Sequence, residues 1–560
     1  MKFSFAFVPL CALLPVPLFG FGADDAGRPV PLTESRPTER PSRENPAPDG
    51  AVKAGKDDVL LPALRGLAIA GTAERALDLQ KKSAGGVMLE GFSEEDAQVI
   101  RKIAEPAIGR AVTLRSLEQL TSALETAFRG EGRSFMKVSF PEQEITSGIV
   151  AVLALPARAG RILLAGQPSF GSGFAADAFR TRPGDDLSGD VVVEDLEWIN
   201  QNPLRRASIS YGDGSAADEL DLSLRVRADK AWRVYAGIDN QLSEDLGDER
   251  LFAGFQYGDL FSLDHRITAQ YTSSADSKSL RGVSGIYEVP LPVRHLLDFS
   301  LGYTESDSDT AGPIDQSGKF SRTALVYRVP LPRWKAISQE WRIGMEFRNN
   351  DYLFSDGSSS DVRFFQLETG WKGRRPDRWG TTRLDASVLY SPGQGVLGSN
   401  DKDFIALGAE GAESWIWRSE LERSLKLSDV LTLVGRCEAQ WSDSVLLSSD
   451  QISAGGYGRV RGFDETVGYA SKGIVSTIEL QSPFYQSPDL GEFQAIAFVD
   501  GALLHRDRDG DVGQLASTGV GLRWRYEEHF SARIDLGIPI DSPNDESGDP
   551  LLHFSVSTTW

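Results

Sequence analysis

Residues 520–538 read VGLRWRYEEHFSARIDLGI, and an apolar side chain occupies every second position on each side of a turn near Glu528. The apolar rows are Val520, Leu522, Trp524 and Tyr526, followed by Phe530, Ala532, Ile534, Leu536 and Ile538. The charged residues interleaved with them include Arg523, Arg525, Arg533 and Asp535. Because successive side chains of a β-strand point to opposite faces, this pattern predicts two strands with one apolar and one charged face. Such strands are typical of a transmembrane β-barrel with a water-filled lumen.

The same alternation extends from Trp232 to Trp560, starting with the row Trp232, Val234, Ala236 and Ile238. Turn signals recur near Leu260, at Val289–Pro292 and Val329–Pro332, and near Pro376, Asp429, Ser487 and Glu528. These spacings predict about 16 strands in a transmembrane antiparallel β-barrel over residues 231–560. A soluble β-sandwich would bury the apolar faces, but it would rarely need so many charges on the other face of every strand.

The Val-Pro-Leu-Pro sequence occurs twice, at residues 289–292 and 329–332. Proline cannot donate to a strand ladder, so both copies are expected to form turns. Longer polar segments fall between the predicted turns. We therefore expect the turns to face the periplasm and the longer loops to face outward.

The last predicted strand places Leu552, Phe554, Val556, Thr558 and Trp560 on one face. A C-terminal aromatic residue preceded by alternating apolar residues is similar to the signal that outer-membrane insertion machinery reads. Phe554, Val556 and Trp560 are therefore the candidate insertion signal, with the barrel-assembly machinery as a partner during biogenesis and outer-membrane lipid around the wall.

The N-terminal residues predict export. Lys2 precedes an apolar stretch, and small residues at 20, 22 and 23 offer a cleavage site, so residues 1–22 read as a signal peptide. A buried strand or a short anchor is the alternative. Residues 23–62 form a proline-rich linker, and beyond residue 22 no apolar run approaches the ~20 residues of a membrane helix. Cys437 would be the single cysteine of the mature chain, so no intrachain disulfide is expected.

Two small α/β units are predicted before the barrel. In the first, a strand at Val87 and Leu89 precedes a helix that starts at a Ser93–Asp96 capping box. A second helix with the stripe Leu114, Leu117, Leu120, Leu124 and Phe128 and strands near 134–140 and 149–155 complete it. Residues 59–82 are ambiguous: four leucines could line a short helix, whereas Leu67 and Ile69 alternate as in a strand.

The second unit is shorter. Its predicted elements are a strand at 161–165, a helix around 192–201, and strands at 207–211 and 220–226. Each unit could also be read simply as a compact domain with an ordinary core.

Four sequence segments carry a resemblance to a known family. The first unit ends in Pro141-Glu142-Gln143-Glu144-Ile145-Thr146-Ser147-Gly148, and the second carries Arg182-Pro183-Gly184-Asp185 before a helix with Asp195, Leu196 and Asn200. The barrel region contains Val460-Arg461-Gly462-Phe463 and Phe498-Val499-Asp500-Gly501. Together they resemble the two-partner secretion transporters of the outer membrane, the TpsB or haemolysin secretion/activation family. The resemblance implies α+β POTRA domains at residues 63–160 and 161–229, located in the periplasm.

The resemblance also implies a functional site. In the family, the loop that carries the Val-Arg-Gly-Phe motif folds into the lumen, and its arginine pairs with the aspartate of the second motif. Here these residues are Arg461, with Val460, Gly462 and Phe463 beside it, and Asp500, with Phe498 on the barrel wall. The turn count places the loop between strands 11 and 12 and Asp500 in strand 13. Pro141, Gln143 and Gly148 mark the POTRA segment implied to bind the client, although their direct role is open.

The chain departs from the family at its N-terminus. Family members often begin with a helix that plugs the pore, whereas here a proline-rich stretch comes first and only residues 59–82 could supply a helix. The sequence therefore leaves open whether the pore is plugged.

The implied function is ATP-free export of an unfolded exoprotein, which the POTRA domains capture and the barrel passes to the cell surface. The resemblance leaves open whether the client is also activated. An assembly factor of the same superfamily, which inserts clients into the membrane, and a passive porin are the alternatives. A net charge of −21 argues against nucleic acid as a partner. The five histidines lack metal-site spacing and no Gly-x-Ser-x-Gly elbow occurs, so no enzyme, metal or cofactor is expected.

Overall fold

The computed structural model contains two compact units, one that ends before Lys230 and one that runs from Lys230 to Trp560. The structure describes residues 58–129, 135–165, 170–216, 218–228, 230–242, 246–308, 316–334, 336–354, 359–465, 467–505, 512–527, 529–541 and 548–560. The predicted signal peptide and all but the last residues of the predicted linker lie outside these ranges.

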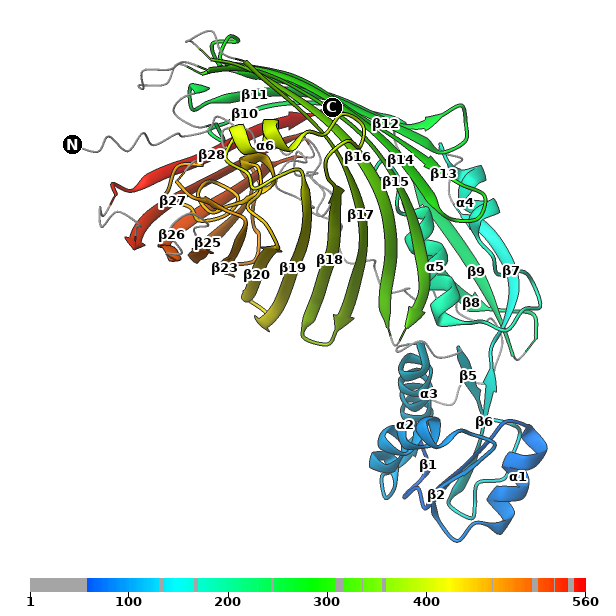
Figure 1. Ribbon diagram of the computed structural model, residues 1–560. Coiled ribbons are helices and arrows are strands. Elements are labelled where there is room, and N and C mark those ends of the chain that lie inside the picture. Colours follow the sequence, from blue (N-terminus) through cyan, green and yellow to red (C-terminus); the bar gives the residue numbers. More distant parts are fainter. Residues whose placement is uncertain are drawn as a thin grey trace. The chain divides into compact units, whose positions relative to one another are not determined.

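The C-terminal unit is a closed antiparallel barrel (Figure 1). Its strands are β10 (Trp232–Asp239), β11 (Arg250–Leu260), β12 (His265–Ser274), β13 (Leu280–Pro290), β14 (Leu296–Ser308), β15 (Gln316–Trp334), β16 (Ile337–Phe354), β17 (Ser359–Asp377), β18 (Gly380–Pro392), β19 (Glu413–Ser428), β20 (Leu431–Ser442), β23 (Lys472–Gln481), β24 (Tyr485–Ser487), β25 (Gly491–His505), β26 (Val512–Tyr526), β27 (Phe530–Asp541) and β28 (Leu551–Thr559). Strands β23 and β24 both pair with β25 and form one interrupted strand. The wall therefore has sixteen strands, as predicted.

The predicted alternation is confirmed along the wall. In β27, Ile534 and Ile538 are exposed on the outer face, whereas Asp535 between them is fully buried on the lumen side. In β10, Trp232 and Val234 point outward and Tyr235 is buried. The outer face can therefore meet lipid, while the inner face holds the charged side chains.

The first and last strands close the barrel. Tyr235–Asp239 of β10 pair with Ser555–Thr559 of β28, and the backbones of Val234 and Trp560 bond to each other in both directions. Beyond this ladder, the Asn240 side chain donates to the Leu552 carbonyl at 2.7 Å and accepts from the Phe554 N–H at 2.8 Å. The asparagine amide thereby lengthens the seam by one further step.

The short connections lie at the end of the barrel where β10 begins. Trp232, the first residue of β10, pairs with Tyr257, which lies close to the short turn after β11. One predicted turn is wrong: Val329–Pro332 lies within β15, which turns only after Trp334. Pairing of β15 with β14 stops at Arg328, so Pro330 lies where the strand is free on that side and a missing N–H is tolerated. The first copy ends β13 at Pro290 and does lead into a turn.

The N-terminal unit contains two larger sheets and one two-stranded sheet, in which β1 pairs with β4. The first larger sheet has the order β3-β2-β6-β5, and the second has the order β7-β9-β8. The elements are β1 (Val59–Leu61), β2 (Gly66–Ala70), α1 (Ala73–Lys82), β3 (Gly86–Glu90), α2 (Glu94–Ala104), β4 (Val112–Thr113), α3 (Leu114–Arg129), β5 (Met136–Ser139), β6 (Ile149–Pro156), β7 (Arg158–Ala165), α4 (Ser172–Ala178), α5 (Gly189–Ile199), β8 (Arg206–Asp213) and β9 (Glu219–Arg227). Helices α1 and α4 and strands β1 and β4 were not singled out in the sequence.

The ambiguous residues 59–82 supply two strands, β1 and β2, and the helix α1. Leu67 and Ile69 of β2 face the core that α2 and α3 cover, while Ala70 and Ala76 pack with Ala151 on the opposite side, where α1 lies. The leucines do not share one helical face. Helix α1 is part of this α/β unit, so it is not a free plug, and none of the helices in the described residues is long and apolar enough to cross a membrane.

Side-chain amides complete the backbone pairing in both α/β units. The Gln143 amide accepts from the Ala151 N–H at 2.6 Å and donates to the Ala151 carbonyl at 2.8 Å, where β5 no longer runs beside β6. Asn200 pairs with both backbone groups of Ala207 in the same way. The conspicuous polar residues of the two motifs thus stabilise the units that carry them.

We predict that Gln143→Ala loosens the first unit, because it leaves both backbone groups of Ala151 without their partner. Loss of such bonds costs about 1–3 kcal/mol, which corresponds to roughly 5- to 150-fold faster amide exchange at Ala151. Hydrogen–deuterium exchange on the full chain measures this. Gln98→Ala, on the exposed side of α2, is the control. Unchanged amide exchange in β6 would contradict the conclusion that Gln143 stabilises this strand.

Candidate functional site

The segment between β20 and β23 folds back against the inner wall of the barrel. Its ends pair as β21 (Ile452–Ser453) and β22 (Tyr469–Ala470), and Val460 donates its N–H to the Ala454 carbonyl. The segment carries its own apolar core against the wall, made by Ile452, Ala454, Val460, Phe463, Ala470, Val475, Ala502, Leu504 and Leu515. The motif residues Val460 and Phe463 therefore anchor the loop, and they hold Arg461 between them.

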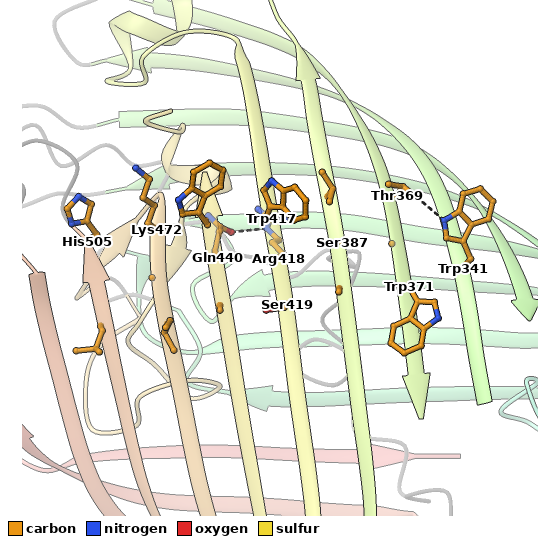
Figure 2. Close-up of a pocket in the computed structure, with 18 residues that line it drawn as sticks. Trp341, Thr369, Trp371, Ser387, Trp417, Arg418, Ser419, Gln440, Lys472 and His505 are labelled. Atoms are coloured by element: carbon orange, nitrogen blue, oxygen red, sulfur yellow. Dashed lines mark hydrogen bonds between the residues drawn. The ribbon is translucent and has the colours of Figure 1, made fainter. Parts of the chain in front are cut away.

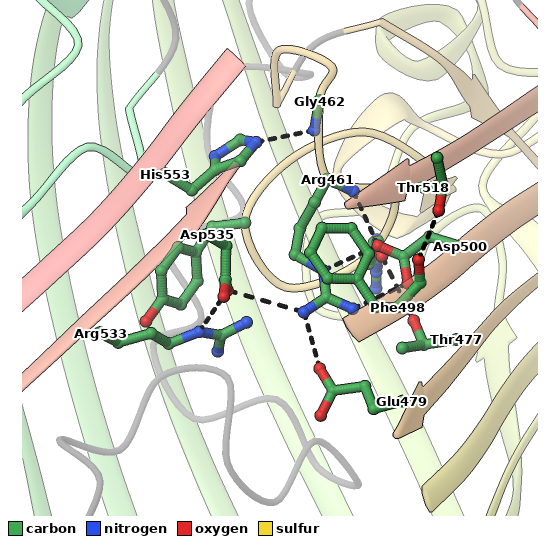
Figure 3. Close-up of polar contacts among 12 residues, drawn as sticks. Arg461, Gly462, Thr477, Glu479, Phe498, Asp500, Thr518, Arg533, Asp535 and His553 are labelled. Carbon is green, nitrogen blue, oxygen red and sulfur yellow. Dashed lines mark hydrogen bonds and ion pairs between the residues drawn. The ribbon is translucent and has the colours of Figure 1, made fainter. Parts of the chain in front are cut away.

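Arg461 forms a bidentate ion pair with Asp500 of β25. Its Nε donates to Oδ2 at 2.7 Å and one terminal nitrogen donates to Oδ1 at 2.9 Å, while its backbone N–H also donates to Oδ2 at 3.1 Å. Arg461 is 2% exposed and Asp500 is 1% exposed. Three charge-assisted bonds to one carboxylate fix both the side chain and the backbone of the loop tip (Figure 3).

The rest of the guanidinium is also occupied. Its other terminal nitrogen donates to Glu479 of β23 at 2.6 Å and lies 3.6 Å from the Asp535 carboxylate of β27. The ring of Phe498 lies under the guanidinium, 3.5 Å from its carbon. Phe498 faces the lumen although it is apolar, because stacking on the cation gives it a partner there.

The site is close to electrically balanced. Asp535 also binds Arg523 at 2.5 Å and Arg533 at 2.7 Å, so three guanidinium groups meet the carboxylates of Glu479, Asp500 and Asp535. Burial opposes the charge on Arg461, but its carboxylate partners outweigh burial and raise the pKa of Arg461 above its ordinary value. Arg461 and the carboxylates of Glu479, Asp500 and Asp535 form a cluster of ion pairs, the ionic latch, that joins the loop to the wall.

Gly462 allows the loop to touch the wall. Its φ of +91° suits glycine, and a Cβ there would lie 2.8 Å from the backbone carbon of Gly537 in β27. The Gly462 N–H donates to Nε2 of His553 in β28 at 2.9 Å. The loop tip is therefore held by backbone contact on one side and by ion pairs on the other.

The structure brings together Val460, Arg461, Gly462 and Phe463 with Phe498 and Asp500. The loop follows the eleventh strand and Asp500 lies in the thirteenth, where the turn count placed them. Glu479 and His553 were not singled out in the sequence. Alternation offered a signal for both, since each lies opposite outward-facing residues such as Ile478 and Leu552.

The other candidate residues lie elsewhere. Pro141, Gln143 and Gly148 belong to the N-terminal unit, where Gly148 accepts the Arg65 N–H at 2.7 Å. Phe554 and Val556 lie in β28, and Trp560 is exposed at the end of the seam.

The family model described as haemolysin secretion/activation protein ShlB/FhaC/HecB matches residues 218–524, more than half of the 560-residue chain. The chain belongs to this family. A second model, the ShlB-type POTRA domain, matches residues 85–156 in the first α/β unit. The resemblance drawn from the motifs is thereby confirmed.

The similar proteins that carry names are transporters. Outer membrane transporter CdiB of Dickeya dadantii (strain 3937) is 22% identical over 459 residues, which cover 78% of this chain and 79% of that protein. Heme/hemopexin transporter protein HuxB of Haemophilus influenzae is 26% identical over 491 residues, covering 81% and 82%. The structure of CdiB from Escherichia coli superimposes with a TM-score of 0.64 at 17% identity, covering 91% and 93% of the two chains, which shows a shared fold.

The protein is an outer-membrane barrel with its POTRA region in the periplasm. Because β10 follows the POTRA region directly, the barrel end with the short turns faces the periplasm and the end with the long loops faces outward. The loop with Arg461 enters the lumen from the outer end.

We predict that Gly462→Ala displaces the loop tip, because the added methyl group meets the Gly537 backbone and the positive φ becomes strained. The barrel should still insert. A protease added outside intact cells should cleave the loop faster by about tenfold or more, as expected for ~1–3 kcal/mol of backbone strain. Gly435→Ala in β20 is the matched control, since its Cβ would meet nothing within 4 Å. Equal proteolysis of the two variants would show that the close approach is not required.

Proposed function

We propose that this protein secretes an unfolded exoprotein through its barrel, in the manner of two-partner secretion. The POTRA region recognises the client in the periplasm, and the loop that carries Arg461 shifts to let it pass. The buried Arg461–Asp500 ion pair supports this proposal most directly, because it ties a lumen loop to the wall through contacts that can be exchanged.

The energetics suit a loop that moves. A buried ion pair gains little net free energy over its hydrated partners, because desolvation offsets most of the attraction. When the loop leaves, water and a passing chain can solvate the same groups. The latch therefore gives the loop one defined position without making that position irreversible.

Client capture is proposed to occur by strand addition. The first sheet has edges at β3 and β5, and the second has edges at β7 and β8. In β7, the consecutive residues Leu163 and Leu164 point to opposite faces of the sheet, and both side chains are about half exposed. An unfolded client could add a strand at such an edge and place apolar side chains beside these leucines.

An assembly factor that inserts clients into the membrane is the second candidate. The family match favours release, since its description is that of a secretion/activation protein. Recovery of the client in the medium or in the membrane fraction separates the two. Phe554, Val556 and Trp560 are proposed to serve insertion of this barrel by the assembly machinery and have no part in client transport.

Arg461→Ala should abolish secretion while the barrel remains inserted. The substitution leaves Asp500 and Glu479 buried without their cation, which costs about 3–5 kcal/mol, so the docked position of the loop is lost. The client in the medium is measured by immunoblot, and heat-modified gel mobility checks the barrel.

Arg281→Ala is the control for this experiment, because Arg281 is an exposed arginine on the outer face that pairs only loosely with Glu305. Secretion should persist in this variant. Secretion at the wild-type level in the Arg461→Ala variant would contradict the proposed role of the ionic latch.

Replacing both Leu163 and Leu164 with asparagine should weaken client capture by about tenfold or more, because two partly exposed apolar side chains lose their favourable burial. Binding of the client's N-terminal segment to the full chain in detergent is measured by interferometry. Substitution of the exposed Leu263, in a barrel turn, is the control. Loss of secretion with normal capture would place the leucines at a later step.

A further inference from the structure

The outer wall of the barrel carries a groove of about 710 Å³ across strands β16 to β25 (Figure 2). Most of its lining residues belong to two neighbouring rows that follow the hydrogen-bonding direction. One row contains Val388, Trp417, Trp441, Lys472 and His505. The other contains Trp341, Trp371, Ala386, Ser419, Ala439, Ile474 and Leu503.

Small side chains form the floor of the groove. Ala386, Ser419 and Ala439 are cross-strand neighbours in β18, β19 and β20. The indoles of Trp417 and Trp441, which are also cross-strand neighbours, stand beside this floor and are about half exposed. Three small residues next to two large ones leave a hollow beside the indoles.

The groove runs from one side of the membrane toward the other. Trp341 and Trp371 lie near the periplasmic turns, and both indoles are fixed by hydrogen bonds, to Thr369 at 3.0 Å and to Gln339 at 3.2 Å. Lys472 and His505 lie opposite each other at the outer ends of β23 and β25. The groove is apolar along most of its length, and the side-chain nitrogen atoms of Lys472 and His505 lie at its outer end.

Lys472 differs from another lysine on the outer wall. Lys319 of β15 also lies near the outer end, but its cross-strand neighbours are the carboxylates Glu305 and Asp351. The neighbours of Lys472 are His505 and Trp441, with its ammonium 6.0 Å from the Trp441 ring. Lys472 is thus placed to attract an anion, whereas Lys319 is already surrounded by negative charge.

We propose that this groove binds one phosphorylated lipid of the outer leaflet, with an acyl chain on the small-residue floor and a phosphate at Lys472 and His505. Aromatic side chains at the membrane interface and basic residues at headgroup level are the chemistry that recognises such a lipid. The site lies on strands seven to thirteen, away from the β10–β28 seam and from the lumen. It lies on the opposite face of the wall from Asp500.

The test uses the full chain in detergent, titrated with hexa-acylated lipid A carrying two phosphates or none and observed by native mass spectrometry. The wild type should retain one lipid A with its phosphates. Ala439→Leu fills the floor and should lower affinity about tenfold for both lipids, as expected for loss of a buried chain. Lys472→Gln should lower affinity about fivefold for the phosphorylated lipid alone.

Ala253→Leu on the outer face of β11 and Lys319→Gln are the matched controls, and neither should change lipid retention. Heat-modified gel mobility confirms that each variant is folded. Equal affinity of wild type and Ala439→Leu would overturn the groove, and equal loss of both lipids in Lys472→Gln would overturn the phosphate site. A protein found in place of the lipid at this wall would also overturn the proposal.

Discussion

A backbone amide inside a bilayer has no water to bond with, and this constraint shapes the whole C-terminal unit. Sixteen strands satisfy it by pairing each neighbour and by closing β10 onto β28. Closure in turn divides the side chains into an outer set and an inner set. The inner set cannot be filled by apolar packing alone in a barrel of this width, so charges line the lumen and a loop with complementary charges can settle there.

The loop and the wall are specific to each other because they combine three kinds of contact. The apolar core around Val460 and Phe463 places the loop, the Gly462–Gly537 approach sets its depth, and the ion pairs fix its orientation. A charged contact alone would tolerate several loop positions. The ring of Phe498 below the guanidinium removes that freedom, because it blocks the space into which Arg461 could turn.

The sequence predicted this architecture where one physical rule dominated. Period-two alternation revealed the strands and the lumen-facing charges, and turn spacing gave the strand number. The turn at Val329–Pro332 was misplaced. Pro330 is tolerated inside β15 because β14 stops pairing at Arg328, and the sequence does not show how far neighbouring strands are offset from each other. Residues 59–82 stayed ambiguous, because short apolar runs fit either structure until the packing partner is known. The Arg461–Asp500 pairing came from family resemblance. Alternation could place Glu479 and His553 on the lumen side, but that they contact the loop tip depends on how the strands are aligned. The outer groove depends on cross-strand register, which the sequence does not display.

The β10–β28 seam also bears on the order of folding. Asn240 and Leu552 are separated by 312 positions, yet they bond directly. Contacts at such separation form late, since loop-closure entropy must be offset by pairings already made. A half-built wall would expose two unpaired edges until the final hairpin arrives, and those edges are open to aberrant pairing with other chains. The asparagine amide that extends the seam therefore adds its two bonds at the late step that removes these open edges.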